Sequence, residues 1–445
     1  MTEGSIVRHI LEFAIPMAVG LMFQQLYNAV DSVVVGQYVS KQALAAVGST
    51  GNIINMLVGL CNGLSVGAGV VISQRFGAKD YDKLHEAVHT TLCVTFILGV
   101  IATAVGMSIV TPMLHMMETP EDVFDQAKTY LTIYFSGMSG LLLYNMGAGI
   151  LRAVGDSRRP LYFLAFSAGL NIVGDLLFVL VFHMGVAGVA LATIIAQFCS
   201  AALVLIVLTR TKEPYGVKWN CLRIRWDMLG KILAVGMPSG IQQAITSFSN
   251  VFVQSYINAF ESACMAGWTS YNKLDAFLLI PVQSIAMAST TFVGQNYGAK
   301  KPTRAKEGVK QSLKLSVVIT AVLAVLMILC KRPLLRLISP EADVIEFGAY
   351  FVSVISPFYV MICFNQIYAG ALRGVGNAKV PMVVMLFCFV LFRQTYLYTT
   401  HQYFGQSLLL TALAYPAGWV LCSILLAICY RRSILFKKEA DPSYA

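Results

Sequence analysis

Long apolar runs, separated by short polar ones, make up almost the whole chain. Twelve of these runs are long enough to cross a bilayer as a helix of about 20 residues. They cover residues 11–38, 45–75, 88–113, 127–151, 160–183, 187–209, 230–258, 267–296, 310–330, 345–372, 380–402 and 407–430. The pattern predicts an all-α polytopic membrane protein with twelve transmembrane helices and no loop long enough for a soluble catalytic domain. The first span lacks the pattern of a cleavable leader and is expected to stay in the mature protein.

Composition and charge favour a membrane over nucleic acid as the partner of this chain. Hydrophobic residues make up 57% of it and charged residues 12%. The formal net charge is +10, but most Lys and Arg residues fall in alternate polar segments, as the positive-inside rule describes for cytoplasmic loops. We therefore expect both termini in the cytoplasm and no nucleic-acid partner. The main exception is the basic group Lys331, Arg332 and Arg336, beside the fifth external loop.

The second half of the chain repeats stretches of the first. Residues 74–79, which end in Gly-Ala-Lys, recur as residues 295–300, and the Leu-Arg-x-Val-Gly stretch 151–155 recurs at the same offset as 372–376. We therefore expect two homologous parts, 1–220 and 221–445, with six spans each. Because six is an even number, both enter the membrane from the same side, which predicts two six-helix bundles related by a pseudo-two-fold axis along the membrane normal. In such folds the substrate binds between the repeats, and access alternates as one bundle rocks against the other.

Three acidic residues lie well inside the spans, and two of them are in the first half. An Asp at the bilayer centre costs about 2.5 to 3.5 kcal/mol on insertion scales, so these residues are functional candidates. Asp175 lies one helical turn from Asn171, on the same face of the fifth span. At 1.5 Å per residue, Asp31 and Asp175 lie about 10 and 12 Å from the outer ends of their spans, and Thr193 lies about 9 Å into the next one. The four groups can therefore converge in the outer half of one bundle.

Two carboxylates, an amide and a hydroxyl form an all-oxygen site that suits a small cation. The cation can be Na⁺, or a proton if burial and mutual repulsion favour the protonated form of one carboxyl. The alternative is that Asp175 only holds two helices together by hydrogen bonding. Pro16 in the first span removes a backbone hydrogen bond and predicts either a fixed kink or a hinge. The ten cysteines show no metal or disulfide pattern, so we expect small core residues and no cofactor apart from the coupling ion.

The third buried acid, Asp275, has different surroundings in the second half. Arg393 in the eleventh span lies at a similar depth, so we expect these two residues to form an ion pair; a carboxylate that contacts substrate is the alternative. Lys273 is two residues from Asp275 and points elsewhere on the helix. Gln242 and Asn250 belong to a polar face of the seventh span that carries no acid. These five residues are candidates for a polar cluster or for substrate contacts.

Together these residues resemble the multidrug and toxic compound extrusion (MATE) transporters over essentially the whole chain. The marks are Pro16 followed by Asp31, Asn171 with Asp175, Thr193, and the two repeated turns. The pattern is similar to the prokaryotic branch around the DNA-damage-inducible protein F (DinF-like) group. The resemblance implies that Asp31, Asn171, Asp175 and Thr193 bind the coupling cation, with Tyr130 and Asn145 as neighbours. Members of another, sodium-coupled branch carry acids in the seventh and tenth spans; this chain has Asn250 and residues 365–368 there, so coupling is expected in the first half alone.

The residues and the resemblance predict a secondary active antiporter that exports amphipathic, mainly cationic drugs in exchange for H⁺ or Na⁺. We expect a monomer embedded in the lipid bilayer of the bacterial plasma membrane. The alternative is a flippase of the same superfamily for a lipid-linked precursor, which needs a cationic central cavity; the buried cations here are few. A membrane-embedded enzyme would need a nucleophile or a metal cluster, and the sequence contains neither a His cluster nor a Ser-His pairing.

Overall fold

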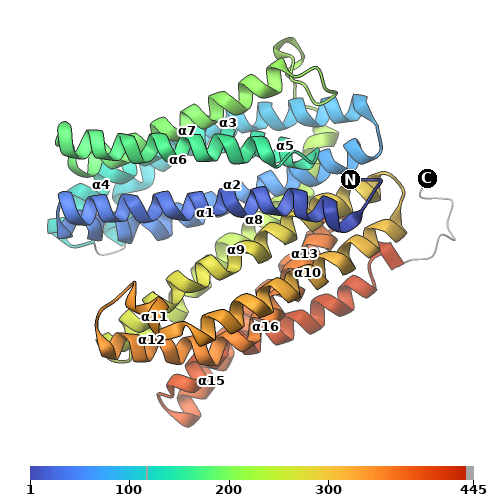
Figure 1. Cartoon of the computed structure of the whole chain (residues 1–445). Helices are drawn as coiled ribbons and strands as arrows, with labels where there is room; N and C mark the ends of the chain where they lie inside the picture. Colours follow the sequence, from blue (N-terminus) through green and yellow to red (C-terminus); the bar gives the residue numbers. More distant parts are fainter. Residues whose placement is uncertain (117–118, 437–445) are drawn as a thin grey trace. The chain divides into compact units, whose positions relative to one another are not determined.

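The predicted spans are helices in the structure, a computed structural model that describes residues 1–116 and 119–436, apart from the side chains of residues 41, 44, 45, 49, 52, 53, 55, 56 and 251. In this part of the chain all regular secondary structure is helical (Figure 1). The first six spans are α1 (Ile6–Tyr38), α2 (Lys41–Gly77), α3 (Tyr81–Met116), α4 (Glu121–Ser136) with α5 (Met138–Ala153), α6 (Arg158–Leu176) with the π-helical η1 (Leu177–Val181), and α7 (Gly185–Arg210).

The last six spans follow the same scheme. They are α8 (Trp226–Asn258), α9 (Ser262–Gly298), α10 (Pro302–Leu329), α12 (Ala342–Ile355) with η3 (Ser356–Phe358) and α13 (Tyr359–Gly374), α14 (Lys379–Leu386) with the π-helical η4 (Phe387–Phe392) and α15 (Arg393–Phe404), and α16 (Leu408–Arg431). Short helices η2 (Trp219–Cys221), α11 (Lys331–Arg336) and η5 (Ile434–Phe436) lie between or after them. The chain is therefore a multi-pass membrane protein with two six-helix bundles.

Ten helical segments in the described residues are long and apolar enough to cross a membrane on their own. The two further spans are α4 with α5, which breaks at Gly137, and α8. Gly137 lies so close to α7 that a Cβ atom there would be 2.3 Å from Ile194 Cγ2. A break that hydropathy alone does not predict therefore coincides with a close approach between helices.

The repeated turns in the sequence have the same backbone conformation. Lys79 and Lys300 both adopt a left-handed conformation, with φ of 56° and 55°. Each donates its backbone N–H to a carbonyl three residues earlier, at 3.1 Å in both turns. Gly155 and Gly376 have φ of 99° and 91°, which a residue without a Cβ atom adopts at no steric cost. The repeated sequence thus encodes a repeated way of ending a helix.

The chain divides into two compact units, and both α1 and α8 are shared between them. One unit is Val19–Gly236, and the other combines Met1–Ala18 with Met237–Ala445. In the second unit the start of α1 packs against α9, where Phe13 and Met17 belong to the same buried cluster as Val293. The halves predicted from the repeat meet at residues 220 and 221, so the two divisions differ in where the first parts of α1 and α8 belong.

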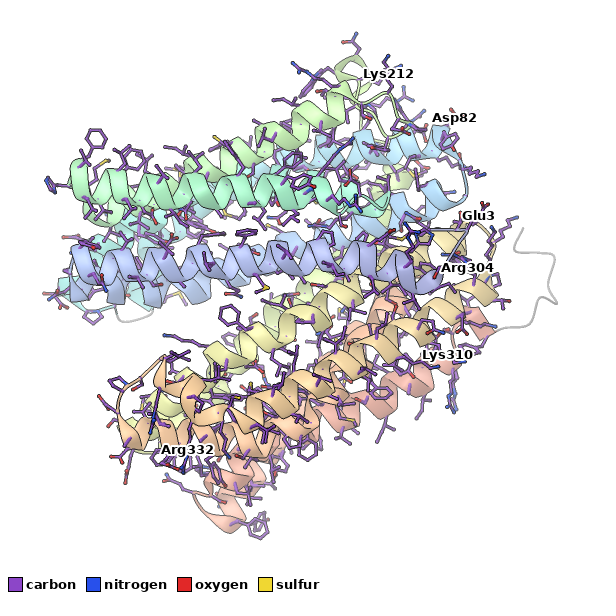
Figure 2. The ribbon with its side chains drawn as sticks, in the orientation of Figure 1. Glu3, Asp82, Lys212, Arg304, Lys310 and Arg332 are labelled. Atoms are coloured by element: carbon purple, nitrogen blue, oxygen red, sulfur yellow. The ribbon has the colours of Figure 1, made fainter. Side chains whose placement is uncertain are left out.

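Polar contacts fix the chain in front of each of these shared helices. Arg304 donates to the carbonyl of Gly4 at 2.8 Å and to that of Met1 at 3.2 Å. In the unit Val19–Gly236, Arg225 forms an ion pair of 2.8 Å with Glu86. In the unit that contains α10, Arg304 lies at one end and Arg332 at the other (Figure 2). The charged side chains that Figure 2 labels there thus lie at the ends of the spans.

All ten cysteines are free. Cys264, Cys363, Cys388 and Cys422 are buried, which agrees with the prediction of small core residues. The prediction is wrong for Cys221 and Cys330, which are exposed because they lie outside the spans, in η2 and after α10.

Candidate functional site

Helices α6 and α7 bring three of the predicted polar groups together. Asn171 and Asp175 are buried on α6, and Asp175 is 0% exposed. Asn171 Nδ2 donates to Thr193 Oγ1 on α7 across 3.4 Å, and that hydroxyl in turn donates to the carbonyl of Val189 at 3.0 Å. The fifth and sixth spans therefore meet at the depth that the residue count indicates.

Asp31 of α1 adds a second carboxyl to this group. It is buried, and its carboxyl lies close enough to that of Asp175 for the two to interact electrostatically. Like charges that are close together repel each other more strongly in a buried site than in water. Adjacent buried carboxyls therefore need a shared proton or a bound cation between them.

Several oxygen atoms of this site have no hydrogen-bond donor. They are Asp31 Oδ1, Asn171 Oδ1 and both carboxyl oxygens of Asp175. Buried polar atoms in folded proteins are nearly always partnered, so a group of unpartnered acceptors needs an explanation. Hard cations are bound by carboxylate and amide oxygens. The arrangement therefore has the donor set of a small-cation site.

The remaining first-half candidates have mixed surroundings. Tyr130 is buried, and it lies close enough to Asp31 and Asp175 to interact with both electrostatically. Asn145 instead donates from Nδ2 to the carbonyl of Leu141 in its own helix at 2.9 Å. Pro16 lies inside α1, two residues before the boundary between the compact units. Whether Asn145 contributes to ion binding and whether Pro16 bends stay predictions.

The predicted ion pair between Asp275 and Arg393 is not formed. The Asp275 carboxylate accepts a hydrogen bond of 2.5 Å from the Tyr359 hydroxyl, which is 2.8 Å from that of Tyr271. Tyr271 is one turn before Asp275 on α9, a spacing that the sequence already contains, whereas Tyr359 comes from α13. The acid is therefore held by phenol groups.

Arg393 has neutral partners as well. Its Nη2 atom donates to Ser249 Oγ at 3.0 Å and to Asn250 Oδ1 at 2.8 Å, and its guanidinium lies 4.9 Å from the centre of the Tyr415 ring. The other two candidates of the second half have different surroundings. Gln242 accepts a hydrogen bond of 2.7 Å from Arg373, and Lys273 is exposed on α9.

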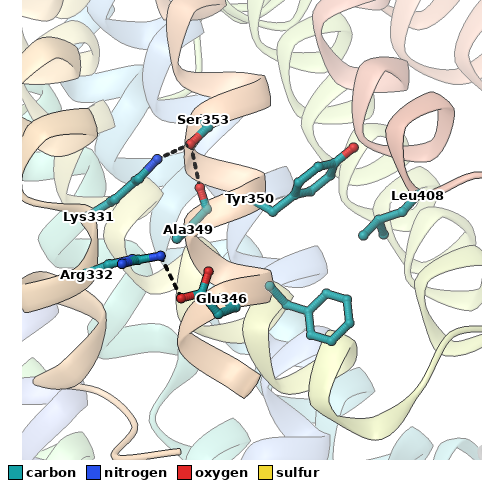
Figure 3. Close-up of a pocket in the computed structure, with 8 residues that line it drawn as sticks. Lys331, Arg332, Glu346, Ala349, Tyr350, Ser353 and Leu408 are labelled. Atoms are coloured by element: carbon teal, nitrogen blue, oxygen red, sulfur yellow. Dashed lines mark hydrogen bonds and ion pairs between the residues drawn. The ribbon is translucent and has the colours of Figure 1, made fainter. Parts of the chain in front are cut away.

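Two members of the basic group, Lys331 and Arg332 of α11, line a pocket of about 430 Å³ (Figure 3). Arg332 forms an ion pair of 2.8 Å with Glu346, and Lys331 donates to Ser353 Oγ at 2.6 Å. These partners satisfy much of the polarity of the pocket. The positive charge of this group, which departs from the positive-inside pattern, is thus partly neutralised by an acid of the neighbouring helix α12.

Comparisons with known proteins bear on both the fold and the family. A family model described as MatE matches residues 16–177 and 238–399, which is most of the chain and once in each half. A probable multidrug resistance protein, YoeA of Bacillus subtilis, is 27% identical over 98% of this chain and 96% of its own length. A protein of Shewanella oneidensis called an FAD transporter is 24% identical over 87% of this chain and 86% of its own length.

The fold also matches a solved structure over nearly its full length. This structure, an outward-facing conformation of a multidrug resistance MATE family transporter, gives a TM-score of 0.93 with 23% identity and covers 98% of both chains. It supports the architecture of twelve spans in two bundles. Since the MatE model covers most of both halves, the chain belongs to the MATE family of transporters.

Proposed function

We propose that the protein is a secondary active antiporter that exports amphipathic organic cations in exchange for H⁺ or Na⁺. The observation that carries the proposal is the meeting of two buried carboxyls, Asp31 and Asp175, with unpartnered oxygen atoms beside Asn171 and Thr193. A cation that enters a site of this kind stabilises it. The cation offsets the repulsion between the carboxyls and is a partner for the oxygen atoms that lack a hydrogen bond.

In this mechanism the two carboxyls bind the coupling cation, while Asn171 and Thr193 complete its ligand shell. Asn171 can supply its free Oδ1 atom to Na⁺, whereas a proton needs only the two carboxyls. Pro16 would let α1 bend when the site fills. Placement in the DinF-like branch and a location in the bacterial inner membrane with cytoplasmic termini belong to the same proposal.

The names of the relatives support drug export to different degrees. YoeA is called a probable multidrug resistance protein, whereas the Shewanella relative is called an FAD transporter. Family membership alone therefore does not set the substrate. Neither of these two relatives nor the solved structure is described as a flippase, so the lipid-linked alternative has no support from them.

Transport in proteoliposomes tests the coupling. Efflux of a cationic dye would be measured under an imposed pH gradient and, separately, an imposed Na⁺ gradient. We expect Asp175→Asn to abolish gradient-driven efflux, because an amide cannot release a proton or balance the charge of Na⁺. Asp275→Asn is the matched control: it changes the same group in the other bundle, where the carboxyl is held by Tyr359. Efflux that persists in Asp175→Asn but stops in Asp275→Asn would assign coupling to the second half.

A further inference from the structure

The second compact unit contains a buried guanidinium without an acidic partner. Arg393 is 3% exposed, and its contacts are the neutral side chains of Ser249, Asn250 and Tyr415. We propose that Arg393 and Asn250 form a binding site for the carboxylate of an amphipathic substrate. The inference rests on the proposed function in that its ligand is the exported compound, which would then be a zwitterion: an organic cation that also carries a carboxylate.

The uncompensated charge of Arg393 is the first reason to expect an anionic ligand at this position. The guanidinium group stays ionised in proteins, and burial of an ion is costly unless an opposite charge or a full set of hydrogen bonds compensates it. In the same unit the partly buried acid Asp275 could have neutralised Arg393, but it is hydrogen-bonded to Tyr359 instead. The acid and the base of this unit are thus each held by neutral groups, which leaves the positive charge of Arg393 available to an anion.

The hydrogen-bonding geometry of the Arg393 guanidinium is the second reason. Nε of Arg393 is buried and has no hydrogen-bond partner, while Nη2 is bound to Asn250. A guanidinium binds a carboxylate through two parallel N–H donors, so a free Nε beside a neutrally bound Nη2 leaves half of such a pair unused. Asn250 is itself exposed, so its contact with Arg393 borders accessible surface. A ligand can therefore reach the buried charge by displacing one amide oxygen.

The local backbone is a third observation. The π-helical segment η4 ends at Phe392, immediately before Arg393. Single π turns inside transmembrane or soluble helices cost regular hydrogen bonding and often occur at functional sites. A π-helical segment also lies near the candidate cation site, where η1 begins two residues after Asp175.

A pair of dyes that differ only in one carboxyl group tests the site. Rhodamine 110 carries a free carboxylate, and rhodamine 123 is its methyl ester. Binding of each dye to the purified full-length protein in detergent would be measured by fluorescence anisotropy. We expect the wild type to bind rhodamine 110 about tenfold more tightly, a difference of ~1.4 kcal/mol. Arg393→Gln should remove this preference and leave the affinity for rhodamine 123 within about twofold.

A second variant guards against misfolding. Asn250→Asp places a carboxylate where the Asn250 oxygen is now 2.8 Å from Arg393 Nη2, so it neutralises the guanidinium without removing it. This variant should be at least as resistant to heat as the wild type and should still lose the preference for rhodamine 110. Gln243→Glu is the matched control, because it adds the same charge two turns away on α8, and it should keep the preference.

The outcomes separate this site from the proposed antiport. Equal affinity of the wild type for the two dyes, including no measurable binding of either, would overturn the site, as would a preference that survives in Asn250→Asp. Gradient-driven efflux of rhodamine 123 is read separately. A wild type that prefers the carboxylate but shows no gradient-driven efflux refutes the antiport and leaves the anion site standing.

Discussion

Asp175→Asn should make the protein more stable at the same time as it stops transport. Asp175 is completely buried and neither of its oxygen atoms has a hydrogen-bond partner, while Oδ1 of the adjacent Asp31 is unpartnered too. An amide has nearly the same shape as the carboxyl, carries no charge and brings two N–H donors. It can therefore donate to Asp31 and end the repulsion between the two acids.

The size of the effect follows from these groups. An unsatisfied buried polar atom costs about 1 to 3 kcal/mol, and a hydrogen bond to a charged group contributes a similar amount. The side-chain oxygen of the introduced Asn still lacks a hydrogen-bond donor, so part of the stabilisation is lost. We expect a net stabilisation of about 2 kcal/mol when no coupling cation is bound.

Thermal unfolding of the purified protein, followed by tryptophan fluorescence, measures this change. Asp31→Asn and the double variant complete a mutant cycle. Each single variant should raise the unfolding midpoint, and the double variant should gain less than the sum, because either change removes the same repulsion. A lower midpoint for Asp175→Asn would refute the reasoning. It would instead support the structural alternative, in which Asp175 holds two helices together.

Two further predictions concern stability away from the cation site. Tyr359→Phe removes the donor that lies 2.5 Å from Asp275 and should destabilise the protein by about 1.5 to 3 kcal/mol; an unchanged unfolding midpoint would contradict this. Gly67→Ala should sharply lower the yield of monodisperse protein in gel filtration, because its Cβ atom would be 2.4 Å from the carbonyl oxygen of Ile232. Gly69→Ala on the same helix meets its nearest atom at 3.9 Å and should behave as the wild type; equal yields of both would count against the close packing.

Hydropathy predicts the spans well because the bilayer imposes their length. The last span was expected at residues 407–430 and is Leu408–Arg431 in the structure. Hydropathy does not predict the breaks inside spans, such as the one at Gly137, because it averages over about 20 residues. At Gly137 the break coincides with close packing against α7, which a single stretch of sequence does not contain.

Counting residues along a span predicts how deep a side chain lies in the membrane, but not which neighbouring helix it faces. Depth alone was enough for Asn171 and Thr193, because α6 and α7 are consecutive and pack side by side. For Asp275 and Arg393 the same argument gave an ion pair that is not formed. The two lie on helices that are not consecutive, so similar depth says little about whether they face each other. Tyr271, one turn from Asp275, was the available sign of a different partner.

Helix α1 explains how an event at Asp31 could affect both compact units. Its first part, with Phe13 and Met17, is packed into the unit that contains most of the second half, while Asp31 belongs to the unit Val19–Gly236. One uninterrupted helix connects them, so a change in its packing at Asp31 can be passed on through the backbone itself. Pro16 lies near the boundary and lacks the N–H of a normal helical hydrogen bond, which makes it the position where bending costs least. If cation binding drives a movement of α1, the bend is therefore expected at Pro16 even though this residue is remote from the carboxyls in sequence.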